Sequence, residues 1–303
     1  MRGPGHVRPA PGGLPNSTRS NGIRTLPEAQ ATPAWNPPEG PLGELTLASA
    51  ERARLAGADP GARAALAACA AKAPAAPPFA AALRAKTVCV IAEIKRRSPS
   101  KGVIDDALSA PTRATEYEAG GAAALSVLTE PTRFGGSLDD LVAVRAAVHL
   151  PLLRKDFITS SFQLLEARAA GASAVLLIAR ALPADRLRAL ADEARALGLE
   201  CLVEVRTERE LETAVSVPAA VIGVNNRDLE TLVIDDAVGR RLLPLVPADR
   251  IAVYESGVRG VDEVERAASW GADAVLVGSV LSGATDGREA VRALGGVRRI
   301  GRA

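Results

Sequence analysis

The amino-acid sequence predicts an α/β protein: a closed barrel of eight strand-helix units, preceded by a disordered leader and an N-terminal helical extension. Three observations support this prediction. Hydrophobic residues make up 48% of the chain and aromatic residues only 3%, so the core must be aliphatic, as in buried parallel strands. Apolar runs alternate with amphipathic segments over roughly 215 residues, the size of a (β/α)8 TIM barrel. Finally, a glycine able to end a helix recurs before several runs.

Each strand is expected where a short apolar run follows a turn-like segment. The eight runs cover residues 87–94, 122–128, 151–155, 173–178, 200–205, 220–224, 251–254 and 273–277. Amphipathic helices are expected between them, for example over residues 183–197 and 261–270. A doubly wound open sheet is the alternative. Eight regular units, without Gly-x-Gly-x-x-Gly after the first strand, argue against it.

Three strands are introduced by the same short pattern. Gly120, Gly171 and Gly271 each precede small residues and then an apolar run. Glycine adopts the left-handed conformation that ends a helix and turns the chain back onto a sheet. The repetition therefore favours repeated helix-to-strand returns.

The chain is expected to divide into three parts. Residues 1–41 are rich in Gly, Pro, Ser and Asn and lack the apolar surface needed to offset ordering entropy. They read as a disordered leader or the product of a start site placed too far upstream. A targeting peptide is the alternative, although the segment has no apolar core and its prolines oppose an amphipathic helix. Residues 42–86 predict two or three short helices, and residues 87–303 form the catalytic barrel.

Charge and cysteine content limit the possible partners. The net charge is +2, from 37 basic and 35 acidic residues, so we expect neither nucleic acid nor a membrane as a partner. No apolar run approaches the roughly 18 residues of a membrane span. The cysteines (Cys69, Cys89 and Cys201) are scattered, which indicates reduced thiols in a cytoplasmic protein. We expect no metal, no cofactor, and a monomer or weak homo-oligomer.

Acid-base chemistry must use lysine and carboxylate side chains, because His6 and His149 are the only histidines. Glu93 and Lys95 lie two residues apart at the end of the first strand, so they share one face. Charges on so apolar a strand must pair or line a polar cavity. Taken alone, the two residues could also form an edge-strand ion pair beside a solvated turn.

Polar residues end four further strands, and such ends form the active site of an α/β barrel. They are Lys155 after the third strand, Glu204 after the fifth, Asn225 after the sixth and Glu255 after the seventh. Unpaired buried charges are costly. Five strands that each end in an inward polar residue therefore indicate a function for those residues.

The last two strands are followed by small residues suited to phosphate. Ser256 and Gly257 follow the seventh strand, and Gly278 and Ser279 follow the eighth. Backbone N–H groups of these loops commonly hold a phosphate in α/β barrels. The Ser98 loop, which lies next to the eighth strand once the barrel closes, can add a hydroxyl. Ordinary turns are the alternative interpretation of each Gly-Ser pair.

Five segments together resemble the indole-3-glycerol-phosphate synthase family and occur in its order. They are 93–102 (EIKRRSPSKG), 125–137 (LSVLTE followed by FGGS), 153–157 (LRKDF), 225–229 (NNRDL) and 255–257 (ESG). The resemblance extends over about residues 79–281. The segment before it, which partly covers the active-site mouth in the family, matches poorly.

The resemblance implies conversion of 1-(2-carboxyphenylamino)-1-deoxyribulose 5-phosphate to indole-3-glycerol phosphate, carbon dioxide and water. It implies Lys155 as general acid and Glu204 as general base. Lys95 would meet the substrate carboxylate and could share the acid role, while Glu93 would hold both lysines. Asn225 would orient the anilino group and Glu255 would meet the ribulose hydroxyls.

The resemblance also implies the binding residues. Phe134 and Phe157 would form walls for the anthranilate ring, with Leu176 and Leu229 beside them. Arg227 would brace its loop through an ion pair. The phosphate site would use Ser98, Ser256, Gly257, Gly278 and Ser279.

Two other functions stay open at this point. An aldolase could use Lys95 or Lys155 to form a Schiff base, which borohydride would trap. A catalytically silent barrel could serve as a binding partner, although such a protein has no reason to keep unpaired inward charges.

Overall fold

The computed structural model describes residues 1–3 and 37–302. The chain divides at Ala34 into two units, and residues 37–302 all lie in the second. Most of the expected leader, residues 4–36, falls outside the described residues. Helix α1 begins at Gly40, just before the position at which the extension was expected to start.

Eight parallel strands close into one barrel, in the order β1-β10-β9-β8-β7-β6-β5-β4. They are β1 (Cys89–Ile94), β4 (Ala124–Leu128), β5 (Leu152–Lys155), β6 (Ala174–Ile178), β7 (Glu200–Val205), β8 (Val221–Asn225), β9 (Ile251–Glu255) and β10 (Ala274–Val277). Each of the eight expected runs contains or overlaps one of these strands. The prediction of a (β/α)8 barrel is therefore confirmed, and the open sheet is wrong.

Closure depends on β1, which pairs with the last strand as well as with the next. Cys89 is paired with Ala274 of β10, and Ile91 with Ala124 of β4. The loop after β1, which contains the short strands β2 (Arg97–Ser98) and β3 (Gly102–Val103), therefore emerges beside the end of β10. This is the neighbour expected for the Ser98 loop.

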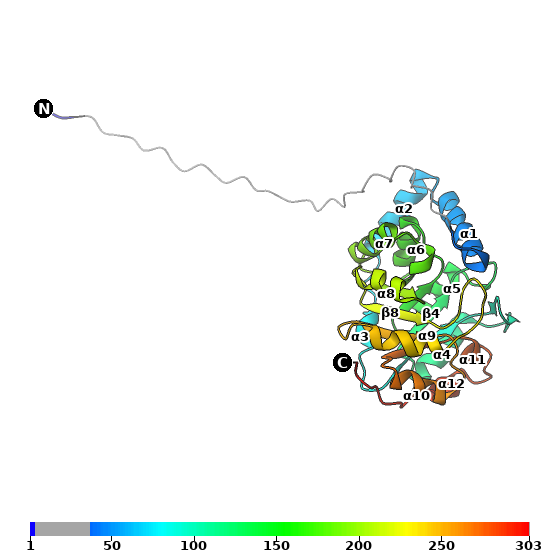
Figure 1. Ribbon diagram of the computed structural model, residues 1–303. Coiled ribbons are helices and arrows are strands. Elements are labelled where there is room, and N and C mark those ends of the chain that lie inside the picture. Colours follow the sequence, from blue (N-terminus) through cyan, green and yellow to red (C-terminus); the bar gives the residue numbers. More distant parts are fainter. Residues whose placement is uncertain (4–36, 303) are drawn as a thin grey trace. The chain divides into compact units, whose positions relative to one another are not determined.

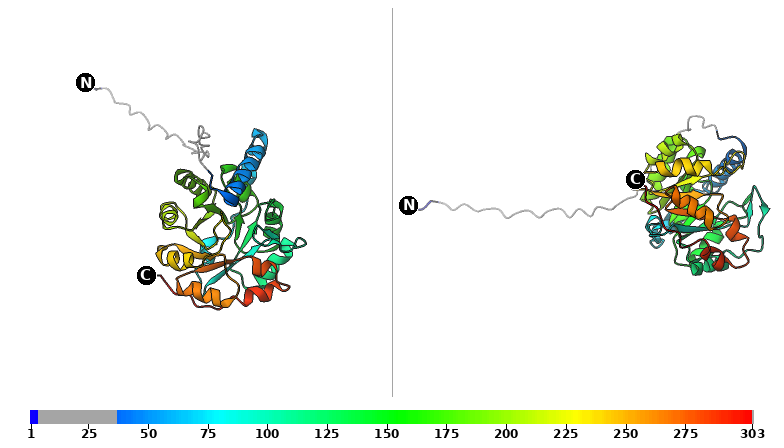
Figure 2. Two further views of the ribbon diagram at one scale, coloured as in Figure 1. Left: turned by 45° about the vertical axis from the view of Figure 1, so that its right-hand side comes forward. Right: turned by 60° about the horizontal axis from the view of Figure 1, so that its bottom comes forward.

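Helices surround the barrel, as Figures 1 and 2 show. They are α4 (Ala110–Gly120), α5 (Leu138–Ala147), α6 (Ser161–Ala169), α7 (Ala184–Ala196), α8 (Glu208–Val215), α9 (Ala237–Leu242), α10 (Val261–Ser269), α11 (Ser279–Ser282) and α12 (Gly287–Arg292), with 3₁₀ turns η1 (Ala179–Ala181) and η2 (Leu243–Leu245). The repeated glycine pattern has the expected effect at Gly171 and Gly271, which have φ of 82° and 91° where helices turn back into strands. At the first repeat the expected Gly120 is the last residue of α4, and the following Gly121, with φ of 94°, ends the helix.

Side chains alternate between two packed layers along each strand. In β1, Val90 and Ala92 face the layer shared with the surrounding helices. Ile91 faces the barrel interior, where it joins Leu153 and Leu202 of other strands. Continuing this alternation places Glu93 inside the barrel.

The N-terminal extension forms α1 (Gly40–Ala56), α2 (Pro60–Lys72) and α3 (Phe79–Ala82). Phe79 of α3 is fully buried within the interior cluster. The backbone N–H groups of Phe79 and Ala80 donate to the Glu200 carboxylate at the start of β7, at 2.7 and 3.0 Å. Helix α3 thus packs at the end of the barrel where the strands begin.

No helix within the described residues is long and apolar enough to cross a membrane. Nor does that part of the chain contain a cluster of three or more His, Cys, Asp or Glu side chains suited to a metal ion. Its cysteines are unpaired, with Cys69 exposed and Cys89 and Cys201 buried.

Candidate active site

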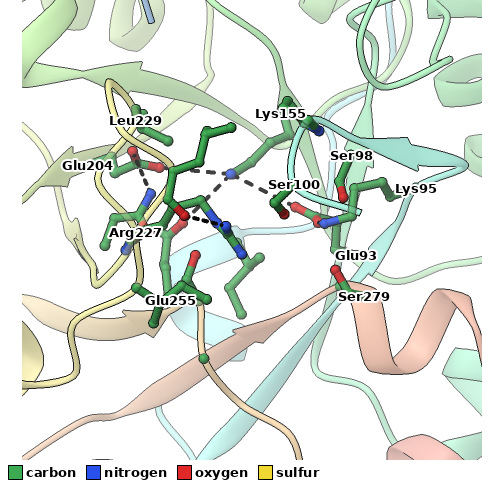
Figure 3. A pocket seen from close by; sticks show the side chains of 18 of the residues that line it. Glu93, Lys95, Ser98, Ser100, Lys155, Glu204, Arg227, Leu229, Glu255 and Ser279 are labelled. Carbon is green, nitrogen blue, oxygen red and sulfur yellow. Dashed lines mark hydrogen bonds and ion pairs between the residues drawn. The ribbon is translucent and has the colours of Figure 1, made fainter. Parts of the chain in front are cut away.

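A cavity of about 520 Å³ lies where the strands end. All of the site residues predicted from the sequence line it, as Figure 3 shows for a labelled subset. They are Glu93, Lys95, Ser98, Phe134, Lys155, Phe157, Leu176, Glu204, Asn225, Arg227, Leu229, Glu255, Ser256, Gly257, Gly278 and Ser279.

The Lys155 ammonium occupies the centre of the polar group (Figure 3). Its Nζ lies 3.7 Å from a Glu255 oxygen and 3.8 Å from an oxygen of both Glu93 and Glu204. Burial opposes the charged form of Lys155, but the three carboxylates outweigh it and raise the pKa of Lys155 above its ordinary value. Lys155 is therefore a cation at neutral pH.

Glu93 bridges the two lysines. Its Oε1 accepts a hydrogen bond of 2.6 Å from Lys95 Nζ, while its Oε2 faces Lys155. Burial favours the neutral form of Glu93, yet Lys95 and Lys155 together hold its pKa below the ordinary value. Glu93 is thus an anion that fixes the positions of both cations.

Glu204 and Asn225 form a second pair on neighbouring strands. Asn225 Nδ2 donates to Glu204 Oε1 at 2.9 Å, and the backbone N–H of Arg227 donates to Asn225 Oδ1, also at 2.9 Å. Because both polar atoms of the Asn225 amide are engaged, this side chain has one orientation. That orientation leaves Glu204 Oε2 directed toward Lys155.

Arg227 braces its loop differently from the sequence-based expectation. Its guanidinium donates to the backbone carbonyl of Leu232 at 2.9 Å. Among residues 37–302 this hydrogen bond, rather than an ion pair, joins the Arg227 side chain to its loop. Burial lowers the pKa of Arg227, and the negative charge of Glu93 opposes this. Leu232 has φ of 64°, a left-handed backbone that turns the loop sharply at this point.

Glu255 is the least satisfied carboxylate of the group. Its Oε1 is buried and has no hydrogen-bond partner among the described residues. Burial, together with the nearby negative charge of Glu204, raises the pKa of Glu255 to about 8, although Lys155 opposes this. Glu255 can therefore exchange a proton close to neutral pH.

A glycine that the sequence analysis did not select makes room for Glu255. A Cβ on Gly223, in the middle of β8, would lie 2.0 Å from Glu255 Oε1. Glycine inside a strand often marks a close approach of another group. This signal in the run 220–224 could have identified Gly223.

Two aromatic rings that contact each other also line the cavity. The centroids of Phe134 and Phe157 are 6.4 Å apart, with an interplanar angle of 39°. Leu176 belongs to the same apolar cluster, and Leu229 packs against it. Helix α1 adds Leu42 and Leu45, which the sequence analysis missed; their spacing of three along a helix was the available signal.

Small residues line the part of the cavity next to β1, β9 and β10. Ser256 and Gly257 have φ of 64° and 91°, and a non-glycine residue in this region carries strain of the kind found at functional sites. The buried Ser98 hydroxyl accepts from the Lys101 backbone N–H at 3.2 Å.

Gly278 is needed for space near the lysine-carboxylate pair. Its φ is −117°, so it does not require the left-handed conformation. A Cβ at this position would instead lie 2.2 Å from Glu93 Oε1 and 2.8 Å from Lys95 Nζ. Any larger residue here must displace that pair.

Comparison with known proteins identifies the family. The family model described as indole-3-glycerol phosphate synthase matches residues 48–294. The chain belongs to this family. It is 58% identical to an indole-3-glycerol phosphate synthase of Nocardioides sp. over 71% of this chain and 82% of the relative. It is 53% identical to indole-3-glycerol phosphate synthase 1 of Streptomyces coelicolor over 70% and 78% of the two chains.

The family and the enzymatic function predicted from the strand-end motifs are therefore confirmed. Indole-3-glycerol phosphate synthases are carboxy-lyases of tryptophan biosynthesis, and this chain is an enzyme of that kind. The expectation that the resemblance begins near Phe79 is wrong, because the family match starts at residue 48, within α1. The segment before Phe79 has too many alanines for its periodicity to reveal this.

Solved structures with low sequence identity share the fold alone. Thiamine phosphate pyrophosphorylase from Pyrococcus furiosus has a TM-score of 0.52 and 19% identity, over 70% of this chain and 95% of that chain. For 3-hexulose-6-phosphate synthase from Salmonella typhimurium the TM-score is 0.53 and the identity 16%, over 68% and 96%.

Proposed function

We propose that the cavity binds 1-(2-carboxyphenylamino)-1-deoxyribulose 5-phosphate and forms indole-3-glycerol phosphate with Lys155 as general acid and Glu204 as general base. The observation that carries this proposal is the single Lys155 ammonium within 4 Å of three buried carboxylates, beside an aromatic-lined pocket.

Ring closure requires an acid at the C2 carbonyl oxygen of the substrate. As the aromatic carbon bearing the carboxylate attacks C2, a new carbon–carbon bond forms and negative charge develops on that oxygen. Lys155 is protonated and buried, so it can stabilise this charge and donate its proton. The carboxylates around it keep the ammonium in place before substrate arrives.

Carbon dioxide then leaves and its bonding electrons restore the aromatic ring. Dehydration follows, in which a base takes a proton from the substrate and an acid donates one to the departing hydroxyl. Glu204, oriented by Asn225, is available as the base. Glu255, whose pKa is about 8, is placed to contact the ribulose hydroxyls near the same proton transfers.

The two ends of the substrate meet different parts of the cavity. The ring packs against Phe134 and Phe157, which line the cavity, with its carboxylate near Lys95. The phosphate fits against backbone N–H groups of Gly257 and Gly278 and the hydroxyl of Ser279. Such anchoring at both ends places the reacting carbon atoms near Lys155.

The electrostatics weigh against a Schiff-base aldolase. A lysine nucleophile must be a neutral amine, whereas three carboxylates favour the ammonium form of Lys155. Lys95 is held by Glu93 at 2.6 Å. A silent barrel also fits poorly, because Glu255 Oε1 is buried without a partner among residues 37–302.

Incubating the purified protein with the carboxyphenylamino ribulose phosphate and following indole fluorescence tests the proposal. We expect turnover, with no covalent adduct after borohydride treatment. Absence of indole formation, or trapping of a lysine adduct, would contradict it. A cytoplasmic location and a monomer or weak homo-oligomer complete this proposal, and size-exclusion chromatography with light scattering tests the second.

A further inference from the structure

Helix α1 contributes one guanidinium that joins two active-site loops. Arg52 NH2 lies 3.3 Å from Asp156 Oδ1, and Arg52 NH1 lies 3.6 Å from Glu130 Oε1. The Arg52 side chain is 35% exposed, whereas those of Glu130 and Asp156 are 0% and 2% exposed. Two buried carboxylates from different loops thus share one cation of the N-terminal extension.

Glu130 determines the backbone of the loop that carries Phe134. Its Oε1 accepts from the Thr132 backbone N–H at 2.9 Å. Its Oε2 accepts from the N–H groups of Arg133 and Phe134, at 2.7 and 3.2 Å. The carboxylate is therefore the centre around which residues 130–134 fold.

Asp156 does the same for the loop that carries Phe157. Its Oδ1, which faces Arg52, accepts from the Phe157 backbone N–H at 2.9 Å. Its Oδ2 accepts from the Thr129 hydroxyl at 2.7 Å and from Arg154 NH2 at 3.1 Å. Since Thr129 directly precedes Glu130, the two carboxylates belong to one connected network.

We infer that Arg52 is a positioning residue for the aromatic ring of the substrate. Arg52 NH2 donates a hydrogen bond to Asp156, and NH1 forms a longer ion pair with Glu130 without a hydrogen bond. By attracting both carboxylates, the guanidinium sets the distance between the loops of Phe134 and Phe157, whose rings are 6.4 Å apart. This role rests on the proposed function, in which the ring packs against those two side chains. One residue of the proposed phosphate site, Ser98, lies in a loop joined to the Phe134 loop, where the Arg97 N–H donates to the Phe134 carbonyl at 3.1 Å. We therefore expect a smaller effect on phosphate binding than on ring binding.

If Arg52 only fastened α1 to the barrel, its loss would not weaken binding of the ring more than binding of the phosphate end. A second ion pair also joins α1 to the same loop, between Glu44 and Arg133 at 3.1 Å. Its side chains are 65% and 56% exposed, and an exposed pair contributes little. Glu44→Gln is therefore a matched control on the same helix.

The experiment compares Arg52→Gln, Arg52→Lys and Glu44→Gln with the parent enzyme. Two inhibitors separate the ends of the substrate: the substrate with its C2 carbonyl reduced to an alcohol, and ribitol 5-phosphate, which lacks the ring. The inhibition constant of ribitol 5-phosphate divided by that of the reduced substrate gives an inhibition ratio that measures the contribution of the ring. Substrate KM and kcat and the melting temperature are measured in parallel.

In Arg52→Gln, the inhibition ratio should fall about tenfold, as expected for losing a charge-assisted contact, and KM should rise more than kcat falls. Lysine lacks the planar guanidinium, so Arg52→Lys should restore only part of the ratio. Glu44→Gln should resemble the parent. An unchanged ratio in an Arg52→Gln enzyme that folds, or equal weakening of both inhibitors, would overturn the inference. Inactivity of the parent toward the substrate would instead contradict the proposed function.

Discussion

Replacing Lys155 with methionine should remove the general acid while keeping the length of the side chain. In the parent, the Lys155 ammonium faces three carboxylate oxygens at 3.7 to 3.8 Å. At an effective dielectric constant of about 20, each such pair is worth roughly 4 kcal/mol. Together these attractions outweigh the cost of burial, which agrees with the raised pKa of Lys155.

The loss of an acid typically lowers a rate about 10²–10⁴-fold, which corresponds to about 3–5 kcal/mol of transition-state stabilisation. Without the ammonium, the carboxylates repel one another, and the pKa of Glu255 should rise further from about 8. Proton uptake then relieves the repulsion, so the variant should still fold at neutral pH but lose stability in alkaline buffer.

The assay is steady-state indole fluorescence, with circular dichroism and thermal melts at pH 6, 7 and 9. Lys72→Met, at an exposed lysine at the end of α2, supplies the same substitution outside the cavity and should behave as the parent. A folded Lys155→Met enzyme with kcat within about threefold of the parent would refute the reasoning.

Four further predictions concern Glu255, Gly278, the phosphate end and the leader. The raised pKa of Glu255 makes the folded enzyme bind a proton more tightly than the unfolded chain. The free energy of unfolding of the parent should therefore fall as pH rises from 4.5, the ordinary pKa of a glutamate, through about 8, by at most about 5 kcal/mol. In calorimetry Glu255→Gln should flatten this decline. Stability curves of the parent and the variant that run parallel with pH would contradict the prediction. Gly278→Val should lower kcat as well as raise KM, because the new side chain meets Glu93. Ser279→Ala should raise KM several-fold for the phosphorylated substrate only, and equal losses with the dephosphorylated substrate would argue against a phosphate site there. Deleting residues 1–36, which spares the cavity-lining Pro41, should leave activity and melting temperature nearly unchanged. The sequence of that segment has no apolar face to dock. A large drop in activity or in melting temperature would show that the segment binds the barrel.

The sequence by itself determined the barrel and the polar ends of its strands. Strand periodicity is a local property, and a parallel strand buried on both faces reads as an apolar run wherever it occurs. A charge at the end of such a run, as at Glu93 or Lys155, must lie where the strand ends converge. The strands, to within two residues at each end, and the polar cavity residues could therefore be predicted without knowing any contact.

Only the tertiary structure decided which groups touch across long separations. Arg52 and Asp156 are 104 residues apart, and no local pattern relates a helix in the extension to the loop after β5. That Gly223 and Gly278 leave space for Glu255 and Glu93 is likewise seen only in the folded barrel. These relations depend on side chains from different strands filling one closed interior, and the packing of that interior is a property of the whole fold.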